Sequence, residues 1–128
     1  MNTKSKIAGI GVDVVDVERM KGVLERQQDY FLNKIFSDME VAYCKSRPRP
    51  YIHFAARFAA KEAVAKAMRT GWSGAFHWKD IEVVNDATGA PHILLVGEVA
   101  RALKECKLHL SISHSDTTVV AFVVMEQM

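Results

Sequence analysis

Three charged residues, Glu62, Lys66 and Arg69, stand at positions i, i+4 and i+7 of an alanine-rich stretch. In a helix this spacing places the three side chains on one face, where a carboxylate and two cations can meet the same ligand. An ordinary surface ion pair between Glu62 and Lys66 would give the same spacing. Both interpretations therefore stay open at this point.

Two further cations, Arg57 and Lys61, stand on the adjoining flank of the same predicted helix. Four positive charges beside one carboxylate suit a ligand that carries several phosphates together with a divalent ion. Mg²⁺ takes one or two protein carboxylates and completes its shell with water and phosphate oxygens. Asp13, at the end of a predicted N-terminal strand, is the best placed second carboxylate for Glu62, although it could also cap the helix that follows.

Two other patterns point to other kinds of site. Gly9 and Gly11 resemble the start of a dinucleotide-binding fingerprint, but the third glycine is missing. We expect these glycines instead to let another backbone approach the strand closely. The segment Ser111–Ser115 places hydroxyls and the His114 imidazole at a strand end. A serine hydrolase would also need an orienting acid and a nucleophile turn, and neither is recognisable.

Hydrophobic spacing predicts the elements that position these residues. A β-branched run predicts a strand over 7–15, and apolar residues at helical spacing predict an amphipathic helix over 17–28. Ser37 and Glu40 form a capping-box pattern, which predicts the start of a short helix. The stretch Tyr51–Met68 lacks glycine and proline and predicts a long helix. Its core face is expected to hold Ala56, Ala60, Ala63, Val64 and Ala67.

The C-terminal half predicts two β-hairpins around a short helix. The expected segments are a first hairpin of Ile81–Val84 and His92–Val96, a helix over Glu98–Cys106, and a second hairpin of Leu108–Ser113 and Thr118–Met125. We therefore predict an α+β fold in which an antiparallel sheet packs on the long helix. The last strand is apolar at consecutive positions, so we expect both of its faces to be buried, with the help of a neighbouring subunit.

The composition is that of a globular protein with one domain, over residues 1–128. Of its 128 residues, 49% are hydrophobic and 25% are charged. The longest apolar run, Val119–Met125, is too short to span a bilayer, and no secretory signal is evident. We therefore expect a cytoplasmic protein with no membrane partner. Cys44 and Cys106 are expected to be free thiols.

The charge distribution indicates an anionic ligand. The net charge of +2 is too small to indicate nucleic-acid binding by itself. Residues 45–69, however, contain seven basic residues and one acidic residue. A non-catalytic module that binds a nucleotide or RNA is the competing function. Asp13 and Glu62 argue against RNA, because carboxylates repel a phosphate backbone unless a metal intervenes.

Four segments, taken in chain order, carry a resemblance to a known family. They are IAGIGVDVVDVERM, FAARFAAKEAVAKAM, DIEVVNDATGAPHILLVG and LSISHS. Over about residues 7–125 the chain resembles the holo-[acyl-carrier-protein] synthases of the AcpS type, which are small 4'-phosphopantetheinyl transferases. Such enzymes move the 4'-phosphopantetheine arm of coenzyme A (CoA) to a serine of an apo acyl carrier protein and release adenosine 3',5'-bisphosphate. The resemblance also implies a homotrimer with active sites between subunits.

The resemblance assigns roles to individual residues. The family's Mg²⁺ carboxylates match Asp13 and Glu62, and its lysine beside the pyrophosphate matches Lys66. Together with the cationic flank noted above, the residues expected to contact CoA are Asp13, Arg57, Lys61, Lys66, Gly89, Pro91 and His114. Many members have a glycine after the helix where this chain has Arg69, so a part for Arg69 in phosphate binding stays open.

The expected reaction is an attack by the carrier serine on the β-phosphate of CoA. Asp13 and Glu62 hold the Mg²⁺ that offsets charge on the pyrophosphate, and Lys66 stabilises the departing side. The proton acceptor is not evident from the sequence. Glu62, directly or through water, is the expected one, and a metal-bound water is the alternative.

One face of the first predicted helix is a candidate docking surface for the carrier protein. Arg19, Val23 and Arg26 stand at i, i+4 and i+7 and therefore share this face. A cation-flanked apolar patch suits an acidic amphipathic helix, and the resemblance implies acidic carriers, of fatty-acid or of secondary biosynthesis. The alternative is that these are solvated charges balanced by Glu18 and Glu25.

Overall fold

The computed structural model describes residues 4–69 and 77–128 and confirms the predicted α+β class. Its elements in chain order are β1 (Lys6–Asp16), α1 (Val17–Gln27), α2 (Asp29–Ile35), α3 (Asp38–Lys45), α4 (Pro50–Met68), the 3₁₀ turn η1 (Trp78–Asp80), β2 (Ile81–Asn85), β3 (Pro91–Leu95), α5 (Gly97–Ala102), β4 (Cys106–His114) and β5 (Thr118–Gln127). None of the described helices is long and apolar enough to cross a membrane.

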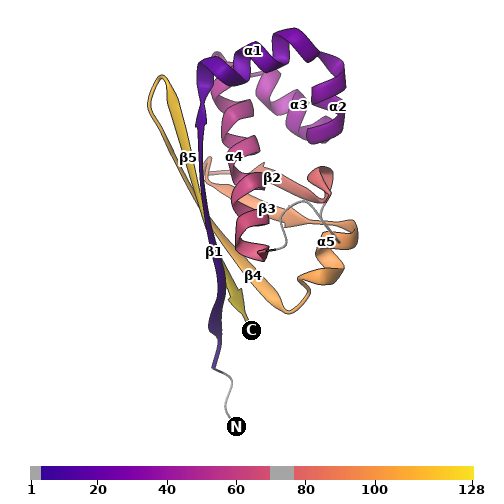
Figure 1. Cartoon of the computed structure of the whole chain (residues 1–128), viewed down its shortest axis with the longest axis vertical. Coiled ribbons are helices and arrows are strands. Elements are labelled where there is room, and N and C mark those ends of the chain that lie inside the picture. Colours follow the sequence, from indigo (N-terminus) through magenta and orange to yellow (C-terminus); the bar gives the residue numbers. More distant parts are fainter. Residues whose placement is uncertain (1–3, 70–76) are drawn as a thin grey trace.

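An antiparallel sheet lies along one side of the long helix α4 and forms one edge of the molecule (Figure 1). The sheet has the strand order β1-β5-β4, and its register places Val12 opposite Phe122 and Phe122 opposite Ser111. Strands β2 and β3 form a separate two-stranded sheet. Helices α1, α2 and α3 gather at one end of α4, and the start of β1 and the C-terminus lie toward the other end (Figure 1).

Helix α4 packs directly on β1 because β1 has two glycines at the contact. A Cβ atom at Gly9 would collide with the carbonyl oxygen of Ala67, and one at Gly11 would collide with that of Ala63. This close approach confirms the structural interpretation of the two glycines. The predicted core face of α4 is also confirmed, since all of its five residues are buried: Ala56, Ala60, Ala63, Val64 and Ala67.

Strand β5 is buried on one face and partly exposed on the other. Val119, Ala121 and Val123 are fully buried on the side of α4. On the opposite face the Phe122 side chain is 41% exposed, and Val12 of β1 beside it is 48% exposed. A single chain therefore buries only one face of β5, and the expected burial of the other face by a neighbouring subunit stays a prediction. Among the described residues, no element packs on this outer face of the sheet.

The N-terminal helices differ from the prediction in one respect. The expected helix over 17–28 ends at Gln27, because Gln28 has a positive φ of 46°, and the chain then forms α2, which was not predicted. The Leu32 and Ile35 side chains on the inner face of α2 are buried. The capping box of α3 is confirmed, with Ser37 and Glu40 each accepting a hydrogen bond from the backbone N–H of the other.

Other predicted elements are close to the observed ones. The two hairpins are present, and each strand extends to within two residues of its expected limits or slightly beyond them. Helix α5 is shorter than predicted and ends at Ala102.

Cys44 and Cys106 are free thiols, as expected. Burial raises the pKa of the Cys44 thiol to about 12, so this cysteine is an unreactive core residue.

Candidate active site

Asp13 and Lys66 meet where β1 crosses α4. The Lys66 ammonium lies 3.1 Å from Asp13 Oδ1 and donates a hydrogen bond to the Val12 carbonyl oxygen at 3.0 Å. Asp13 does not cap the following helix, because Asp16 does so by accepting from the Arg19 N–H. The inward direction of Asp13 follows from strand alternation, since it shares the face of β1 that carries the two glycines against α4.

Glu62 is half-buried beside this pair. Burial raises the pKa of the Glu62 carboxyl, the negative charge of Asp13 raises it further, and Lys66 opposes the shift. Asp13 and Glu62 both line one pocket, so the two carboxylates face a common space. In that space their repulsion is only partly neutralised by Lys66, so a bound cation would be stabilised there.

This donor set fits Mg²⁺. Mg²⁺ is commonly held by one or two carboxylates while phosphate and water oxygens fill the other positions. The described part of the chain contains no group of three or more histidine, cysteine, aspartate or glutamate side chains that could hold a metal ion by themselves. Asp13 and Glu62 would therefore need oxygens from a phosphate-bearing ligand to complete the shell.

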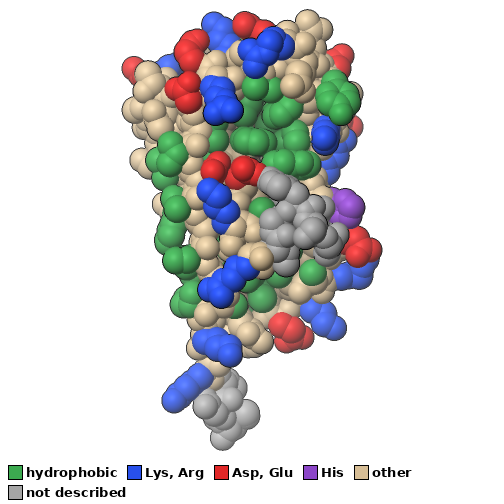
Figure 2. All heavy atoms as spheres, viewed as in Figure 1, with side chains coloured by type: hydrophobic (Ala, Val, Ile, Leu, Met, Phe, Trp, Pro, Cys, Tyr) green, Lys and Arg blue, Asp and Glu red, His purple; other side chains and the backbone are tan. Residues whose placement is uncertain are grey.

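A pocket of about 550 Å³ opens beside the two carboxylates. Its lining residues are Asp13, Val14, Val15, Asp16, Arg19, Met20, Val23, Phe31, Phe58 and Glu62. Hydrophobic side chains gather on this face above a group of acidic side chains, with basic side chains above and below (Figure 2). Arg19 and Val23 thus belong to the pocket wall, whereas Arg26 is exposed further along α1.

The aromatic wall of this pocket is built around Phe58. The Phe58 ring stacks on Trp78 with centroids 5.2 Å apart and lies 5.9 Å from the Phe31 ring. Phe58 stands one helical turn before Glu62 on α4, but the sequence analysis assigned its ring no role. Phe31 was missed because α2 was not predicted.

Arg57 lies on another side of α4. It is buried, its Nη2 donates to Asn85 Oδ1 at 2.7 Å, and its guanidinium lies 4.4 Å from the centre of the Tyr43 ring. Asn85 in turn donates to the carbonyl oxygen of Gly89 at 3.0 Å, in the turn between β2 and β3. Arg57 and Lys66 are nine residues apart, which places them about 180° apart around an α-helix. The structure therefore does not bring all the predicted cations to one face.

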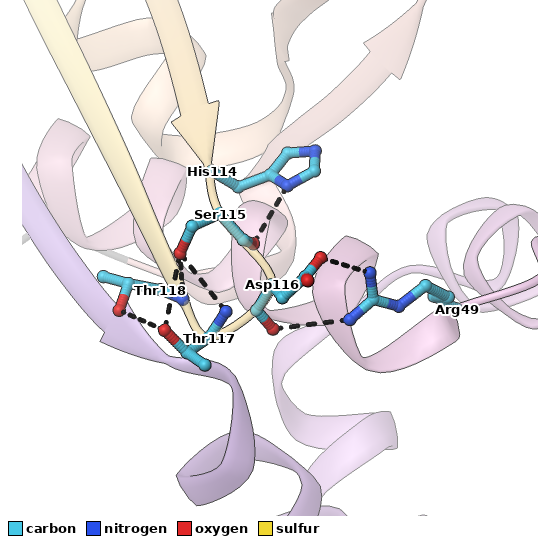
Figure 3. A network of polar contacts seen from close by, with 6 residues as sticks. All are labelled: Arg49, His114, Ser115, Asp116, Thr117 and Thr118. Atoms are coloured by element: carbon cyan, nitrogen blue, oxygen red, sulfur yellow. Dashed lines mark hydrogen bonds and ion pairs between the residues drawn. The ribbon is translucent and has the colours of Figure 1, made fainter.

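The turn between β4 and β5 belongs to the same side as Arg57. Burial lowers the pKa of His53 on α4, and the positive charges of Arg57, Arg47 and His114 lower it further, so these cations surround one region. Figure 3 shows His114 donating from Nδ1 to the Ser115 carbonyl oxygen at 3.2 Å.

Arg49, which sequence reasoning did not single out, holds the tip of the β4–β5 turn. Its Nη1 lies 2.7 Å from Asp116 Oδ1, and its Nη2 donates to the Asp116 carbonyl oxygen at 3.4 Å (Figure 3). The basic composition of residues 45–69 was the available signal for this arginine, but the composition could not identify its partner.

Lys61 is fully buried and has no access to a ligand. Its ammonium lies 2.9 Å from Glu40 Oε1 and donates to the carbonyl oxygens of Trp78 and Ile81. Burial lowers the pKa of Lys61, and the adjacent Glu40 carboxylate opposes that shift. All three N–H donors of the ammonium are thus used within the protein. This placement contradicts the expected contact between Lys61 and CoA.

Comparison with known proteins identifies the family. The family model described as the 4'-phosphopantetheinyl transferase superfamily matches residues 9–123, which is most of the chain. The chain belongs to this superfamily. Among curated relatives of this phosphopantetheinyl transferase, the holo-[acyl-carrier-protein] synthase of Halothermothrix orenii is 42% identical over 124 residues, covering 94% of this chain and 98% of the relative.

Solved structures of phosphopantetheinyl transferases share the fold. The holo-[acyl-carrier-protein] synthase from Neisseria meningitidis superposes with a TM-score of 0.87 at 34% identity, covering 94% of this chain and 98% of that one. The holo-(acyl-carrier-protein) synthase from Bacillus anthracis str. Ames, solved in complex with CoA (3',5'-ADP), superposes with a TM-score of 0.81 at 36% identity, covering 95% and 98% of the two chains.

Proposed function

We propose that this phosphopantetheinyl transferase moves the 4'-phosphopantetheine group of CoA to a serine of an apo acyl carrier protein, which gives the holo carrier and adenosine 3',5'-bisphosphate. The observation that carries this function is the arrangement of Asp13, Glu62 and Lys66 beside an apolar pocket. Relatives named as holo-[acyl-carrier-protein] synthases support it. A non-catalytic nucleotide- or RNA-binding module is not supported, because the relatives are enzymes.

Each of the three residues has a defined part in the reaction. Asp13 and Glu62 would hold a Mg²⁺ ion, which when bound supplies a positive charge to the pyrophosphate of CoA. Lys66 uses two N–H donors on Asp13 and the Val12 carbonyl, so a third can be donated to a phosphate oxygen on the departing side. Glu62, which faces the pocket, accepts the proton of the carrier serine, directly or through water.

The two groups of predicted CoA contacts support an assembly with sites between subunits. Asp13 and Lys66 lie on one side of α4, whereas Arg57 and the turn of Gly89 lie on another. Arg57 and Lys66 lie on opposite sides of α4, so a CoA molecule that contacted both groups of one chain would have to pass around this helix. In our proposal CoA therefore spans two neighbouring copies.

A homotrimer is the assembly that we propose, as the family resemblance implies. The outer face of the β1–β5–β4 sheet provides the contact, because it carries large apolar side chains that are 41–62% exposed: Ile10, Val12, Val14 and Phe122. An apolar sheet face of this kind is rarely left in water by a monomer.

The carrier protein would dock on the wall of the 550 Å³ pocket formed by α1 and α2. Arg19 lies at the rim and Val23 at the wall, so an acidic amphipathic helix can place charged residues on the first and apolar residues on the second. Arg26 extends the cationic side along α1. The carrier serine would then reach the space between Asp13 and Glu62.

One assay tests the activity. The protein is incubated with CoA, Mg²⁺ and an apo carrier of bacterial fatty-acid synthesis, which is the acceptor we propose to use first, and the carrier is weighed by mass spectrometry. We expect the mass of the carrier to increase by one phosphopantetheine group, with none added to a carrier whose serine is replaced by alanine. Unmodified carrier in the presence of both substrates and Mg²⁺ would contradict the proposed function. The two free thiols fit the reducing cytoplasm, where we propose that the reaction occurs.

A further inference from the structure

Glu40 and Lys61 form a buried ion pair that the proposed reaction does not use. The Glu40 side chain is 1% exposed and that of Lys61 is 0% exposed, and the charged atoms are 2.9 Å apart. Glu40 Oε1 also accepts from the Ser37 N–H at 3.0 Å, and Oε2 accepts from the Val83 N–H at 2.8 Å. With the bonds of Lys61 to the Trp78 and Ile81 carbonyls, the pair joins α3, α4, η1 and β2.

The pair attaches the N-terminal part of β2 to α3, through Glu40, and to α4, through Lys61. Ile81, which begins β2, accepts from Lys61, and Val83 donates to Glu40. The other end of β2 is fixed by the hydrogen bond between Arg57 and Asn85. Two attachments along one strand determine its direction on the helix, whereas a single attachment would leave it free to pivot.

The direction of β2 on α4 determines the position of the turn between β2 and β3. The turn carries Gly89, with a φ of +90°, and is followed by Pro91 at the start of β3. Asn85 Nδ2 donates to the Gly89 carbonyl oxygen, so a rotation of β2 would move the turn relative to Arg57. A buried charged pair can hold such a direction because its donors and acceptors are satisfied in one geometry only.

We propose that Glu40 and Lys61 are positioning residues, which hold the β2–β3 hairpin on α4 so that its exposed turn forms a preorganised contact surface for CoA, with Arg57 supporting the turn through Asn85. This inference rests on the proposed contact of the turn with CoA. It predicts that the pair affects the binding of CoA more than the chemical step or the binding of the carrier.

The test uses the double variant Glu40→Gln/Lys61→Met, which removes both charges and nearly preserves volume. We expect the KM for CoA and the Kd for adenosine 3',5'-bisphosphate to rise about tenfold, because a small displacement of a positioning group is costly. The kcat and the KM for the carrier should change less than about twofold. Amide hydrogen exchange should accelerate in β2 and β3.

A matched control separates positioning from stability. Val64→Ala removes buried volume from α4 without touching the pair, and it should lower the melting temperature with no change in the KM for CoA. The single variant Glu40→Asp keeps the negative charge beside Lys61 but shortens the reach to the Val83 N–H, and it should shift the KM for CoA in the same direction by a smaller factor. This milder change gives the decisive reading if the double variant does not fold.

Two results would overturn the proposal. One is an unchanged KM for CoA and an unchanged Kd in a folded variant, and the other is an equal rise in the KM for CoA with Val64→Ala at the same stability. Failure of the proposed function is a separate outcome, since the wild-type protein would then transfer no phosphopantetheine. In that case accelerated exchange confined to the β2–β3 hairpin would still support positioning of the hairpin, and unchanged exchange would refute it.

Discussion

Lys66 pairs with Asp13 across the contact between α4 and β1, not with Glu62 one helical turn before it. Among the ion pairs of the described residues, none joins Lys66 to Glu62. The i, i+4 spacing alone favoured a surface pair on one helix. The observed pair instead ties the helix to the strand and leaves the Glu62 carboxylate facing the pocket.

Loss of either carboxylate should abolish transfer without unfolding the protein. We expect Asp13→Asn and Glu62→Gln each to lower kcat/KM by about 100-fold or more, because among the described residues no third carboxylate is grouped with these two to hold Mg²⁺. Mg²⁺ and CoA together should raise the melting temperature of the wild type and not that of the variants. Glu105→Gln, at an exposed position away from the pocket, is the control. A near wild-type rate at low Mg²⁺ in either variant would refute the metal assignment.

Replacement of Lys66 tests whether charge alone suffices. Lys66→Ala should lower kcat by about 100-fold, because a donor to the departing phosphate is lost. Lys66→Arg should not restore the rate, since a planar guanidinium cannot reproduce the bonds of a compact ammonium to Val12 and Asp13. Steady-state kinetics of both variants at saturating CoA provide the measurement. Full recovery by arginine would show that position within the site matters less than charge.

The parts of the fold that depend on local sequence could be predicted. The capping box of Ser37 and Glu40 acts within one turn, and the alanine face of α4 repeats at helical spacing, so both were found. Helix α2 could not be predicted, because Gln28 adopts a positive φ without being a glycine. The residue types therefore give no signal that α1 ends and a new helix begins at this point.

The site was predicted where one helix face defines it and was missed where distant partners define it. Arg57 and Lys61 carry the same charge as Lys66, and nothing in their spacing reveals that Asn85 and Glu40 bind them. Those partners lie 28 and 21 positions away in the sequence. Their contacts depend on how α3 and β2 pack on α4, which only the tertiary structure provides.

Arg69 should be replaceable by glycine with a gain in stability. It caps the C-terminal end of α4 with a φ of +63°, in the left-handed region that disfavours side chains with a Cβ atom. We expect Arg69→Gly to raise the free energy of unfolding by about 1 kcal/mol. Gly89→Ala, at φ +90°, should have the opposite effect. Urea denaturation measures both, and an unchanged midpoint for Arg69→Gly would show that the arginine makes a compensating contact.

A charged residue on the outer sheet face should dissociate the proposed trimer. We expect Phe122→Glu to sediment as a monomer at micromolar concentration and to lose activity, because the carboxylate would be buried between subunits. Circular dichroism must be recorded with it, so that dissociation is distinguished from unfolding. Leu94→Glu, on β3 at a position that is 48% exposed, is the matched control and should remain a trimer. An active wild-type monomer would contradict the assembly.

Asp86 should make the stability of the β2–β3 turn depend on pH. Hydrogen bonds from the Thr88 hydroxyl and from His92, together with the Thr88 and Ala90 N–H groups, hold the pKa of the Asp86 carboxyl well below its usual value of 3.8. A carboxyl with a lowered pKa binds fewer protons in the folded state than in the unfolded state. Its stabilising effect is therefore complete above the usual value and is lost as the pH falls toward the lowered one.

Removal of the Asp86 carboxylate should accordingly matter more at neutral pH than in acid. We expect Asp86→Ala to lower the urea midpoint at pH 7, and the difference from the wild type should shrink as the pH falls from 5 to about 2. Thr88→Val, which removes the hydroxyl donor, should show the same trend with a smaller amplitude. Denaturation curves at four pH values decide the matter, because a difference that is independent of pH would mean that the turn is held by its backbone alone. The KM for CoA of Asp86→Ala should rise in parallel, since the same turn carries Gly89.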